Sequence, residues 1–311
     1  MSFKYPEALQ PGDRIGMVAP ASPFDVDRFY RGIEVIRDMG FEPVYTDRIF
    51  YKNGYFAGTA KERARDIHDF FAAPDIMALW AVRGGYGSLR LLAELDYEAI
   101  AKTPKIFIGC SDITALLITL SLRCEMPVFH GPVAASLADA DADTIEGLGR
   151  AFKCLRSLEI KSRHGLVIQE GRADGPVLGG NLATLCHLLA TPYAPDFTGC
   201  ILFVEDTGEK PYRIDRMLTQ MRLAGCFDGI AGLAAGSFKD CGKSGEVDRI
   251  FSELFADVRF PVISGFPAGH GSPNMTLPFG VWATLDSDCR SLAYHCSAVP
   301  KPADDSGAGG I

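Results

Sequence analysis

The 311-residue sequence lacks the features of a membrane protein or a nucleic-acid-binding protein. Its longest apolar runs, residues 114–122 and 229–238, are much shorter than the roughly 20 residues needed to span a bilayer. Basic residues are also few, because 31 of them stand against 39 acidic residues and leave a net charge of −8. No basic field is available to attract phosphate groups, so we expect neither a membrane nor a nucleic acid as a partner.

The sequence also lacks closely spaced cysteines. Its nine cysteines stand at least seven residues apart, mostly within apolar segments, and form no CxxC motif. This pattern indicates reduced, buried thiols rather than a disulfide scaffold or a cysteine metal site, and we expect no metal and no other cofactor. Near the N-terminus, a glutamate, two prolines and an Asp-Arg pair precede a short apolar stretch, unlike a signal peptide. We therefore expect a cytoplasmic protein.

The overall composition is that of a folded globular protein, with 47% hydrophobic and 23% charged residues. At roughly 100 to 200 residues per domain, the length indicates two domains or one large one. In the N-terminal half, short apolar strands alternate with helix-like segments, which predicts a parallel sheet with helices on both faces. Strands are expected at 15–19, 42–45, 75–82 and 105–109, and helices at 24–39, 61–73, from 83–87 through 95, and at 112–123.

The C-terminal half mixes helices with strands of uncertain direction. Strands are expected at 200–204, 229–235, 261–264 and 281–285, with helices at 212–223 and 247–256 and another after 175–181. Between the halves, the composition shifts to alanine and aspartate, with ADADAD at 138–143, and then becomes polar and irregular. The expected divisions are an N-terminal domain at 1–135, a linker at 136–172, a C-terminal α/β domain at 173–300 and a disordered tail at 301–311.

A glycine-rich turn follows the third expected strand. Its sequence, Arg83-Gly84-Gly85-Tyr86-Gly87, is neither the GxxxxGK[ST] loop of P-loop proteins nor a full GxGxxG fingerprint. Backbone N–H groups at such a turn before a helix suit an anion or a developing oxyanion. The alternative is a tight turn in which glycine is needed only for its positive φ.

Ser111 lies at the bend between the strand at 105–109 and the helix that follows. This is the geometry of a nucleophile elbow, which exposes the hydroxyl at the edge of the sheet and makes the N–H group of the next residue, Asp112, available to an oxyanion. The segment is not GxSxG, because Ile113 replaces the second glycine, and a simple N-cap is the alternative role of Ser111. Cys110 is a rival nucleophile, although burial in the core explains it better.

A serine nucleophile needs a base and an orienting carboxylate. Of the six histidines, His130 and His270 follow a strand or stand in a glycine-flanked loop, and the residues alone leave both open as the base, as well as a structural role for either. Glu205 and Asp206 follow the strand at 200–204, where side-chain alternation turns only one of them toward the histidine. Acids at that position are costly unless solvated or paired; an exposed loop is the alternative.

Taken together, these segments resemble the LD-carboxypeptidase family of serine peptidases, which includes muramoyltetrapeptide carboxypeptidases and microcin C immunity proteins. The resemblance covers nearly the whole chain and rests on the number and order of short motifs. They are Gly12-Asp-Arg-Ile-Gly-Met-Val-Ala-Pro-Ala-Ser-Pro, Arg83-Gly-Gly-Tyr-Gly, Gly109-Cys-Ser-Asp-Ile-Thr, His130-Gly-Pro, Leu178-Gly-Gly-Asn-Leu, Phe203-Val-Glu-Asp, Pro211-Tyr-Arg-Ile-Asp-Arg and Gly265-Phe-Pro-Ala-Gly-His.

The resemblance implies a catalytic triad in which Ser111 is the nucleophile, His270 the general base and Glu205 its orienting partner. It also implies an oxyanion hole made by the N–H groups of Asp112 and Gly85. The implied fold has two α/β domains: a flavodoxin-like, doubly wound N-terminal domain that carries the serine, and a C-terminal domain with a mixed sheet that carries the acid and the histidine. The active site then lies between the domains, a common position for pockets.

Two further positions qualify this picture. Arg83, with Gly84 beside it, is a candidate contact for the substrate carboxylate, and an ordinary surface ion pair is the alternative for the arginine. An aromatic residue precedes the serine in many relatives, so Cys110 is a departure that affects local packing more than the triad.

Members of this family remove the terminal D-alanine from muropeptide tetrapeptides in peptidoglycan recycling. The resemblance implies the same reaction here, on a small peptide and in a homodimer. The alternative is an immunity-type hydrolase that cleaves peptidyl or aminoacyl nucleotides with the same triad. Such members have a longer insertion between acid and histidine, whereas Glu205 and His270 are 65 residues apart with no tryptophan between them, which favours the muropeptide. A non-catalytic binding protein, in which Ser111 only caps a helix, is the alternative from another class.

Overall fold

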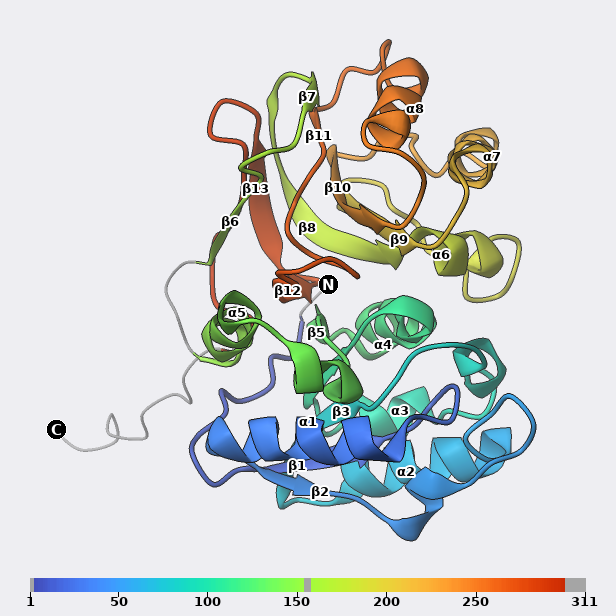
Figure 1. Cartoon of the computed structure of the whole chain (residues 1–311), viewed down its shortest axis with the longest axis vertical. Helices are drawn as coiled ribbons and strands as arrows, with labels where there is room; N and C mark the ends of the chain where they lie inside the picture. Colours follow the sequence, from blue (N-terminus) through green and yellow to red (C-terminus); the bar gives the residue numbers. More distant parts are fainter. Residues whose placement is uncertain (1–2, 154–157, 300–311) are drawn as a thin grey trace, which may run out of the picture.

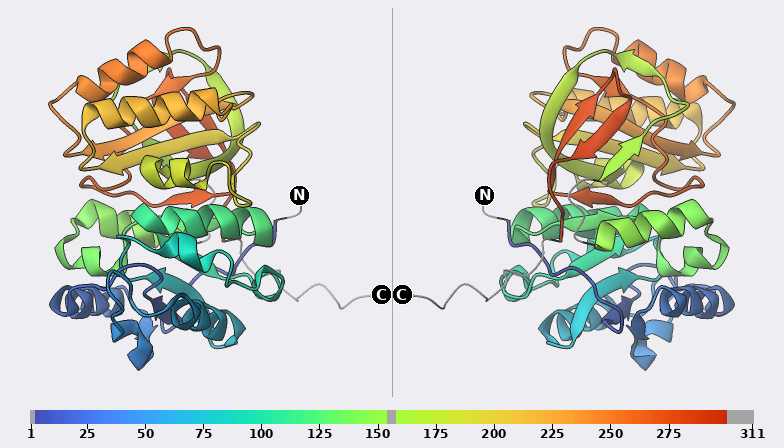
Figure 2. Two further views of the ribbon diagram at one scale, coloured as in Figure 1. Left: turned by 90° about the vertical axis from the view of Figure 1, so that its right-hand side faces the viewer. Right: turned by 90° about the vertical axis from the view of Figure 1, so that its left-hand side faces the viewer.

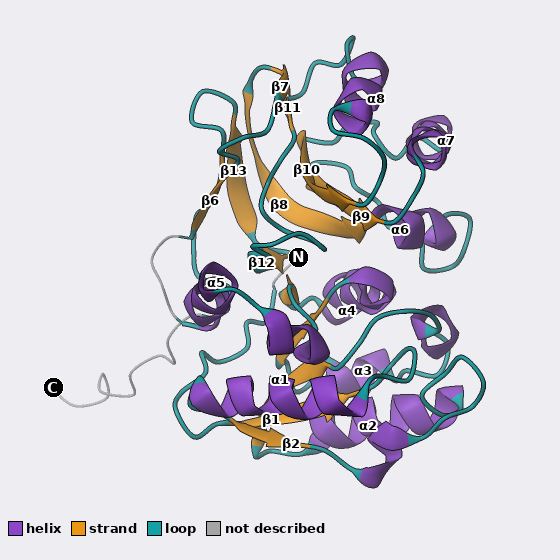
Figure 3. Cartoon of the chain, in the orientation of Figure 1, coloured by secondary structure: helices purple, strands orange, loops and turns teal. Residues whose placement is uncertain are grey.

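Two β-sheets, one above the other, form the frame of the molecule (Figure 1). The computed structural model describes residues 3–153 and 158–299. The N-terminal half builds most of the first sheet and the C-terminal half builds most of the second, with helices packed around both (Figure 3). The expected two-domain α/β fold is therefore confirmed.

Five strands of the first sheet are parallel and follow the order β2-β1-β3-β4-β5, the flavodoxin-like doubly wound order. Helices lie on both faces of this sheet (Figure 2). The order reverses between β1 and β3, and such sheets bind ligands outside the carboxyl ends of their strands near this point. The strands are β1 (Arg14–Val18), β2 (Glu42–Val44), β3 (Ile76–Ala81), β4 (Ile106–Gly109), β5 (Val128–His130) and β12 (Leu277–Phe279).

Local sequence explains where the helices of the first half begin. The side chain of Asp25 caps α1 (Val26–Asp38), which buries Ile33 and Ile36 against the core. Thr59 and Glu62 form a capping box at the start of α2 (Ala60–Ala72). The other helical segments are η1 (Asp47–Phe50), η2 (Ser88–Leu91), α3 (Tyr97–Ile100), η3 (Ser111–Ile113), α4 (Thr114–Cys124), η4 (Ala134–Asp139) and α5 (Ala142–Phe152).

The second sheet is mixed, as expected. Its order is β6-β14-β13-β8-β9-β10-β11-β7, in which the run from β8 to β11 is parallel and the remaining pairings are antiparallel. The strands are β6 (Glu159–Lys161), β7 (Val167–Gln169), β8 (Arg172–Asn181), β9 (Ile201–Thr207), β10 (Gly232–Lys239), β11 (Val262–Ile263), β13 (Trp282–Asp286) and β14 (Ser291–Tyr294). Its helices are α6 (Leu182–Leu188), α7 (Pro211–Leu223) and α8 (Glu246–Leu254).

Two segments differ from the prediction. The helix expected through residue 95 is a short 3₁₀ helix, η2, and a separate helix, α3, begins where Asp96 accepts a hydrogen bond from the N–H of Ala99. The irregular linker expected at 136–172 contains α5, β6 and β7 instead. Asp141, within the alanine-aspartate run, caps α5 by accepting from the N–H of Thr144 at 2.8 Å, so the run marks a helix start. The tail expected to be disordered, 301–311, lies outside the described residues.

One strand crosses from the second half of the sequence into the first sheet. β12 pairs antiparallel with β5, with Leu277 opposite His130, although it lies within the segment expected to form the C-terminal domain. The chain then returns to the second sheet with β13. The loop between β11 and β12, which contains His270, therefore passes between the two sheets (Figure 1).

The two halves also contact each other through α4. The N–H of Asn181, at the end of β8, donates to Thr114 Oγ1 at 3.0 Å. Gly180, with a φ of 135°, leaves no room for a side chain, because a Cβ there would lie 2.5 Å from Thr114 Oγ1. This close approach holds the sheets in a fixed relation. Within residues 3–153 and 158–299, none of the helices is both long and apolar enough to cross a membrane.

Candidate active site

A cavity of about 660 Å³ opens between the two sheets. Its walls come from the turns after β3, β4 and β5, from the end of β10 and from the loop around His270. The loop after β1 adjoins it, since the N–H of Ser22 donates to the carbonyl of Gly84 at 3.3 Å. The cavity thus lies outside the carboxyl ends of the parallel strands, where doubly wound sheets bind ligands.

Ser111 borders this cavity in a strained backbone conformation. Its φ is 63°, in the left-handed region that non-glycine residues seldom adopt. Neither η3 nor α4 has a side-chain cap at its start, so the N-cap role considered for Ser111 does not hold. Gly84 packs against it closely, because a Cβ there would lie 2.8 Å from Ser111 Cβ. This backbone is that of a nucleophile elbow, which presents a hydroxyl to a site.

His270 faces the same cavity and is paired with Glu205. The two are joined by a hydrogen bond of 2.6 Å between His270 Nδ1 and Glu205 Oε2, and Glu205 is fully buried. A carboxylate only accepts, so Nδ1 carries the proton and Nε2 is left as the acceptor. Asp206 points elsewhere and accepts hydrogen bonds from Asn181 Nδ2 and from the N–H of Ala183 at the start of α6. The choice between the two acids therefore falls on Glu205.

The pairing with Glu205 changes the protonation of His270. Burial alone would lower the pKa of this imidazole, but the hydrogen bond and negative charge of Glu205 outweigh it. The pKa of His270 is therefore raised above its ordinary value of 6.5. An imidazole paired in this way accepts a proton readily, because the carboxylate of Glu205 stabilises the imidazolium that results.

The two predicted oxyanion donors lie on the turns after β3 and β4. Asp112 belongs to the first turn of η3, where backbone N–H groups have no acceptor within the helix. Its side chain is used structurally, since Asp112 Oδ2 accepts from the N–H of Ser88 at 2.8 Å. Gly85 lines the cavity with a φ of 99°, and a Cβ there would lie 2.6 Å from Ser22 Oγ. Gly85 therefore lines the same cavity as Ser111, and Asp112 directly follows Ser111 in η3.

Among the described residues, three cations line the cavity, and the sequence indicated only one of them, Arg83. Arg83 lines the cavity and its guanidinium donates to the carbonyl of Pro23 at 2.5 Å; within the described chain it has no ion pair. Arg28 is committed to an ion pair of 2.7 Å with Asp139. Lys239, the last residue of β10, also lines the cavity. Nothing in its sequence context points to a site, because only the sheet arrangement brings it close to His270.

The rival candidates occupy different environments. Burial raises the pKa of the Cys110 thiol to about 12, so the thiol stays protonated and is a poor nucleophile. His130 is fully buried and stacks on Phe279, with ring centroids 5.4 Å apart. Burial lowers its pKa to about 4. Neither has the solvent access and carboxylate partner that His270 combines.

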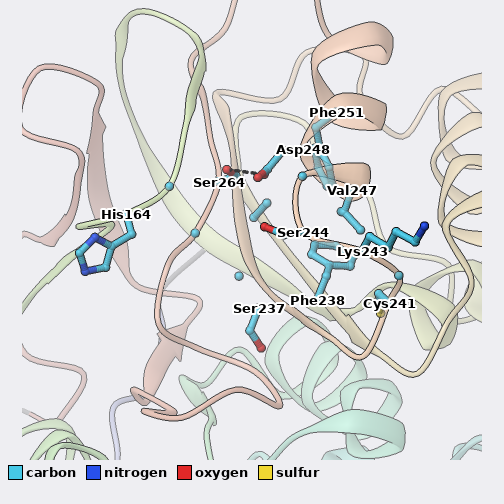
Figure 4. Close-up of a pocket in the computed structure, with 16 residues that line it drawn as sticks. His164, Ser237, Phe238, Cys241, Lys243, Ser244, Val247, Asp248, Phe251 and Ser264 are labelled. Carbon is cyan, nitrogen blue, oxygen red and sulfur yellow. Dashed lines mark hydrogen bonds between the residues drawn. The ribbon is translucent and has the colours of Figure 1, made fainter.

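A second cavity of about 310 Å³ lies in the C-terminal half, between the end of β10 and the start of α8 (Figure 4). It is lined by side chains such as His164, Lys243 and Asp248, and the last of these accepts from Ser264 Oγ at 2.9 Å. It contains none of the predicted site residues. Its wall is nevertheless linked to the His270 loop, because the N–H of Gly271 donates to Ser237 Oγ at 2.8 Å.

Comparison with known proteins identifies the family. The LD-carboxypeptidase N-terminal domain matches residues 15–131, and the LD-carboxypeptidase C-terminal domain matches residues 174–285. The murein tetrapeptide carboxypeptidase of Pseudomonas aeruginosa is 32% identical over 302 residues, which cover 91% of this chain and 96% of the relative. This chain belongs to the LD-carboxypeptidase family.

Solved structures agree with this assignment. The muramoyltetrapeptide carboxypeptidase from Oxalobacter formigenes has a TM-score of 0.82 at 31% identity, covering 93% of this chain and 100% of that one. The microcin C7 self-immunity protein MccF in its wild-type apo state has a TM-score of 0.87 at 27% identity, covering 95% and 99%. Family membership supports a peptidase-type hydrolase, and the chain resembles both members named for murein tetrapeptides and a member named for self-immunity to microcin C7.

Proposed function

We propose that this chain is a serine-type LD-carboxypeptidase that removes the terminal D-alanine from muropeptide tetrapeptides. The observation that carries the proposal is the 2.6 Å bond between His270 Nδ1 and Glu205 Oε2, on the wall of a cavity that also holds the strained Ser111. A nucleophile, a base and an orienting carboxylate are the parts that covalent peptide hydrolysis requires. The site needs no cofactor for this chemistry.

In the proposed mechanism, His270 Nε2 takes the proton of Ser111 as Oγ attacks the carbonyl between diaminopimelate and D-alanine. The N–H groups of Gly85 and Asp112 hold the negative oxygen that forms. The imidazolium then gives its proton to the amine of D-alanine, which leaves. Water, activated by the same imidazole, cleaves the acyl-enzyme and releases the tripeptide and Ser111. Glu205 stabilises the imidazolium in both halves of the reaction.

A carboxypeptidase must also recognise the free carboxylate at the end of its substrate. Arg83 and Lys239 line the cavity and supply the positive charge for this role. Gly84 keeps the approach to Ser111 open, since a side chain there would collide with the serine. We place the reaction in peptidoglycan recycling in the cytoplasm and the active enzyme in a homodimer.

A second candidate is hydrolysis of aminoacyl or peptidyl nucleotides with the same triad. The observation in favour of this second function is the TM-score of 0.87 to the microcin C7 self-immunity protein. The chain has no tryptophan between Glu205 and His270, and the described residues of that interval give the cavity no aromatic side chain to stack on a base. The muropeptide is therefore the preferred substrate.

The test compares two substrates on one enzyme preparation. We expect D-alanine release from L-Ala-γ-D-Glu-meso-diaminopimelate-D-Ala with a kcat/KM at least about tenfold above that for cleavage of glutamyl sulfamoyl adenosine. The reverse order would favour the immunity-type reaction. Labelling by a fluorophosphonate adds a readout that needs no substrate: a serine hydrolase is labelled at Ser111, whereas a non-catalytic binding protein is not.

A further inference from the structure

A second histidine beside the site has no part in the proposed mechanism. His130 ends β5 and is 0% exposed. Its ring stacks on Phe279 and packs on Phe203, with centroid distances of 5.4 and 5.2 Å. Within the described chain, neither of its ring nitrogens has a hydrogen-bond partner. Buried polar groups are nearly always paired, so an imidazole held in this position requires an explanation.

Glu205 also has a buried polar atom that is unpaired within the described chain. Its Oε2 is bonded to His270, but its Oε1 is buried and has no partner among the described residues. Phe203 and Glu205 are two residues apart on β9, so their side chains lie on the same face of that strand. Because the ring of His130 contacts Phe203, it lies on the Glu205 side of β9. An unused donor and an unused acceptor thus share the buried space between the sheets.

The protonation state of His130 fits this relation. Burial lowers the pKa of His130 to about 4, against the charge of Glu205, which acts in the opposite direction. The ring is therefore neutral at pH 7 and carries one N–H group to donate. A neutral donor next to a carboxylate stabilises the ionised form without adding a second charge to the site.

We propose that His130 is a positioning residue for Glu205, whose Oε1 receives a hydrogen bond from the neutral His130 ring through one buried water. Such a water needs at least two polar partners, which the ring N–H and Oε1 provide. The second fixed contact keeps Oε2 aimed at His270 Nδ1. The inference rests on the proposed function, because it concerns the carboxylate of the same triad.

The proposed hydrogen bond from His130 through water to Glu205 Oε1 predicts the direction of a pH effect. Donation to Oε1 favours ionised Glu205, so it opposes addition of a proton to the Glu205–His270 pair. Removing the donor moves the protonation midpoint of the pair to higher pH, whichever partner takes the proton. The other titratable groups acting on the pair are Cys110 after β4, Asp206 on β9 and Lys239 on β10, and all three stay unchanged in the test.

The test replaces His130 in two ways. His130→Phe keeps a ring for the stack and removes the donor, whereas His130→Asn and His130→Gln keep an amide N–H near one or the other ring nitrogen. We expect His130→Phe to raise the NMR titration midpoint of His270 by about one pH unit and to lower kcat at least about tenfold with little change in KM. At least one amide variant restores the native midpoint. Phe279→Leu, which loosens the stack but keeps the donor, is the matched control and keeps the native midpoint.

The titration is recorded in a Ser111→Ala background and needs no substrate, so it remains readable if the proposed reaction fails. A folded His130→Phe protein with the native midpoint would overturn the proposal and leave His130 a packing residue. Where His130→Phe does not fold, His130→Leu removes the donor instead: a raised midpoint in His130→Leu together with a native midpoint in one amide variant supports the proposal, and a native midpoint in His130→Leu contradicts it.

Discussion

Burial disfavours the charged form of three neighbouring side chains at the site, but their pKa values end in different places. It raises the pKa of the Cys110 thiol to about 12 and lowers that of His130 to about 4, so both are uncharged at pH 7. His270 is also largely buried, but Glu205 holds its pKa above 6.5. Of the three, His270 alone can therefore exchange a proton near neutral pH. The carboxylate, rather than the depth of burial, therefore sets His270 apart as the proposed base.

The first prediction concerns pH. The base must be neutral, and its pKa is raised, so kcat/KM should increase with pH through a midpoint above 6.5. In Glu205→Gln, burial acts without the compensating charge, so the midpoint should fall below the native value and kcat should fall by about 10³ to 10⁴. Asp206→Asn, which alters the adjacent acid, should move the midpoint much less. A Glu205→Gln profile with the native midpoint would contradict the pairing.

The second prediction concerns Cys110. Because its thiol is buried and protonated, iodoacetamide at pH 8 should leave activity intact while it modifies the exposed Cys289 and Cys296. Cys110→Ala should retain most of the native activity, since the thiol takes no part in the reaction. Mass spectrometry of the modified protein identifies the alkylated residues. Alkylation of Cys110 under these conditions would contradict a buried, protonated thiol, and loss of activity in a folded Cys110→Ala protein would contradict the assignment of the serine as the nucleophile.

At the residue scale, the residues alone indicated the serine but left open which histidine is the base, His130 or His270, and which acid orients it. The bend after a strand pointed to Ser111, because a strand-to-helix turn with a hydroxyl is a local pattern. The choice between Glu205 and Asp206 depends on which face of β9 meets the other sheet, and strand alternation alone cannot provide that. Lys239 and the orphaned ring of His130 have no local signal, since their surroundings are assembled from distant strands.

At the scale of single elements, the turn after β3 carries a steric requirement. Gly84→Ala would place a Cβ 2.8 Å from Ser111 Cβ and 3.2 Å from the carbonyl of Cys110. We expect it to lower kcat strongly, because the serine must shift, while the melting temperature changes little. Gly149→Ala in α5, where nothing lies within 4 Å of the new Cβ, is the control and should keep native kcat. Native kcat in Gly84→Ala would mean that the turn tolerates a side chain.

Elements were predictable where the pattern is local. The alternation of apolar strands and amphipathic helices is enough to place β1 to β4, and the signal is strongest for β1, β3 and β4, which are buried on both faces. The alanine-aspartate run was misread as a linker, since aspartate serves equally in loops and as the cap of α5. β12 could not be foreseen: it has three residues, including Pro278, and is a strand only because β5 offers it an edge.

At the scale of the whole molecule, the first sheet depends on chain that comes after residue 135. β12 covers the edge of β5, and Phe152 from α5 packs on Trp80 and Phe129 with centroid distances of 5.7 and 5.9 Å. The isolated segment 1–135 should therefore lack a cooperative thermal transition, and 1–153, which regains α5, should recover it only in part. Circular dichroism measures both. A cooperative transition in 1–135 would show an independent N-terminal domain.

The candidate site lies between the sheets, so its residues come together only when both halves of the chain are assembled. Ser111 comes from the first sheet, Glu205 from the second and His270 from the loop that passes between them. Neither half contains the proposed nucleophile together with the proposed base. The reaction therefore requires the assembled chain, and it is best tested on the intact protein.

The most direct test of the central claim is D-alanine release from L-Ala-γ-D-Glu-meso-diaminopimelate-D-Ala by the native chain and by Ser111→Ala. We expect stoichiometric release of D-alanine and tripeptide by the native protein, and a fall of at least about 10³ in rate in the folded variant. The same peptide ending in L-alanine is the control and should be cut poorly. No release by the native protein would remove the muropeptide assignment, and release undiminished in Ser111→Ala would contradict the nucleophile.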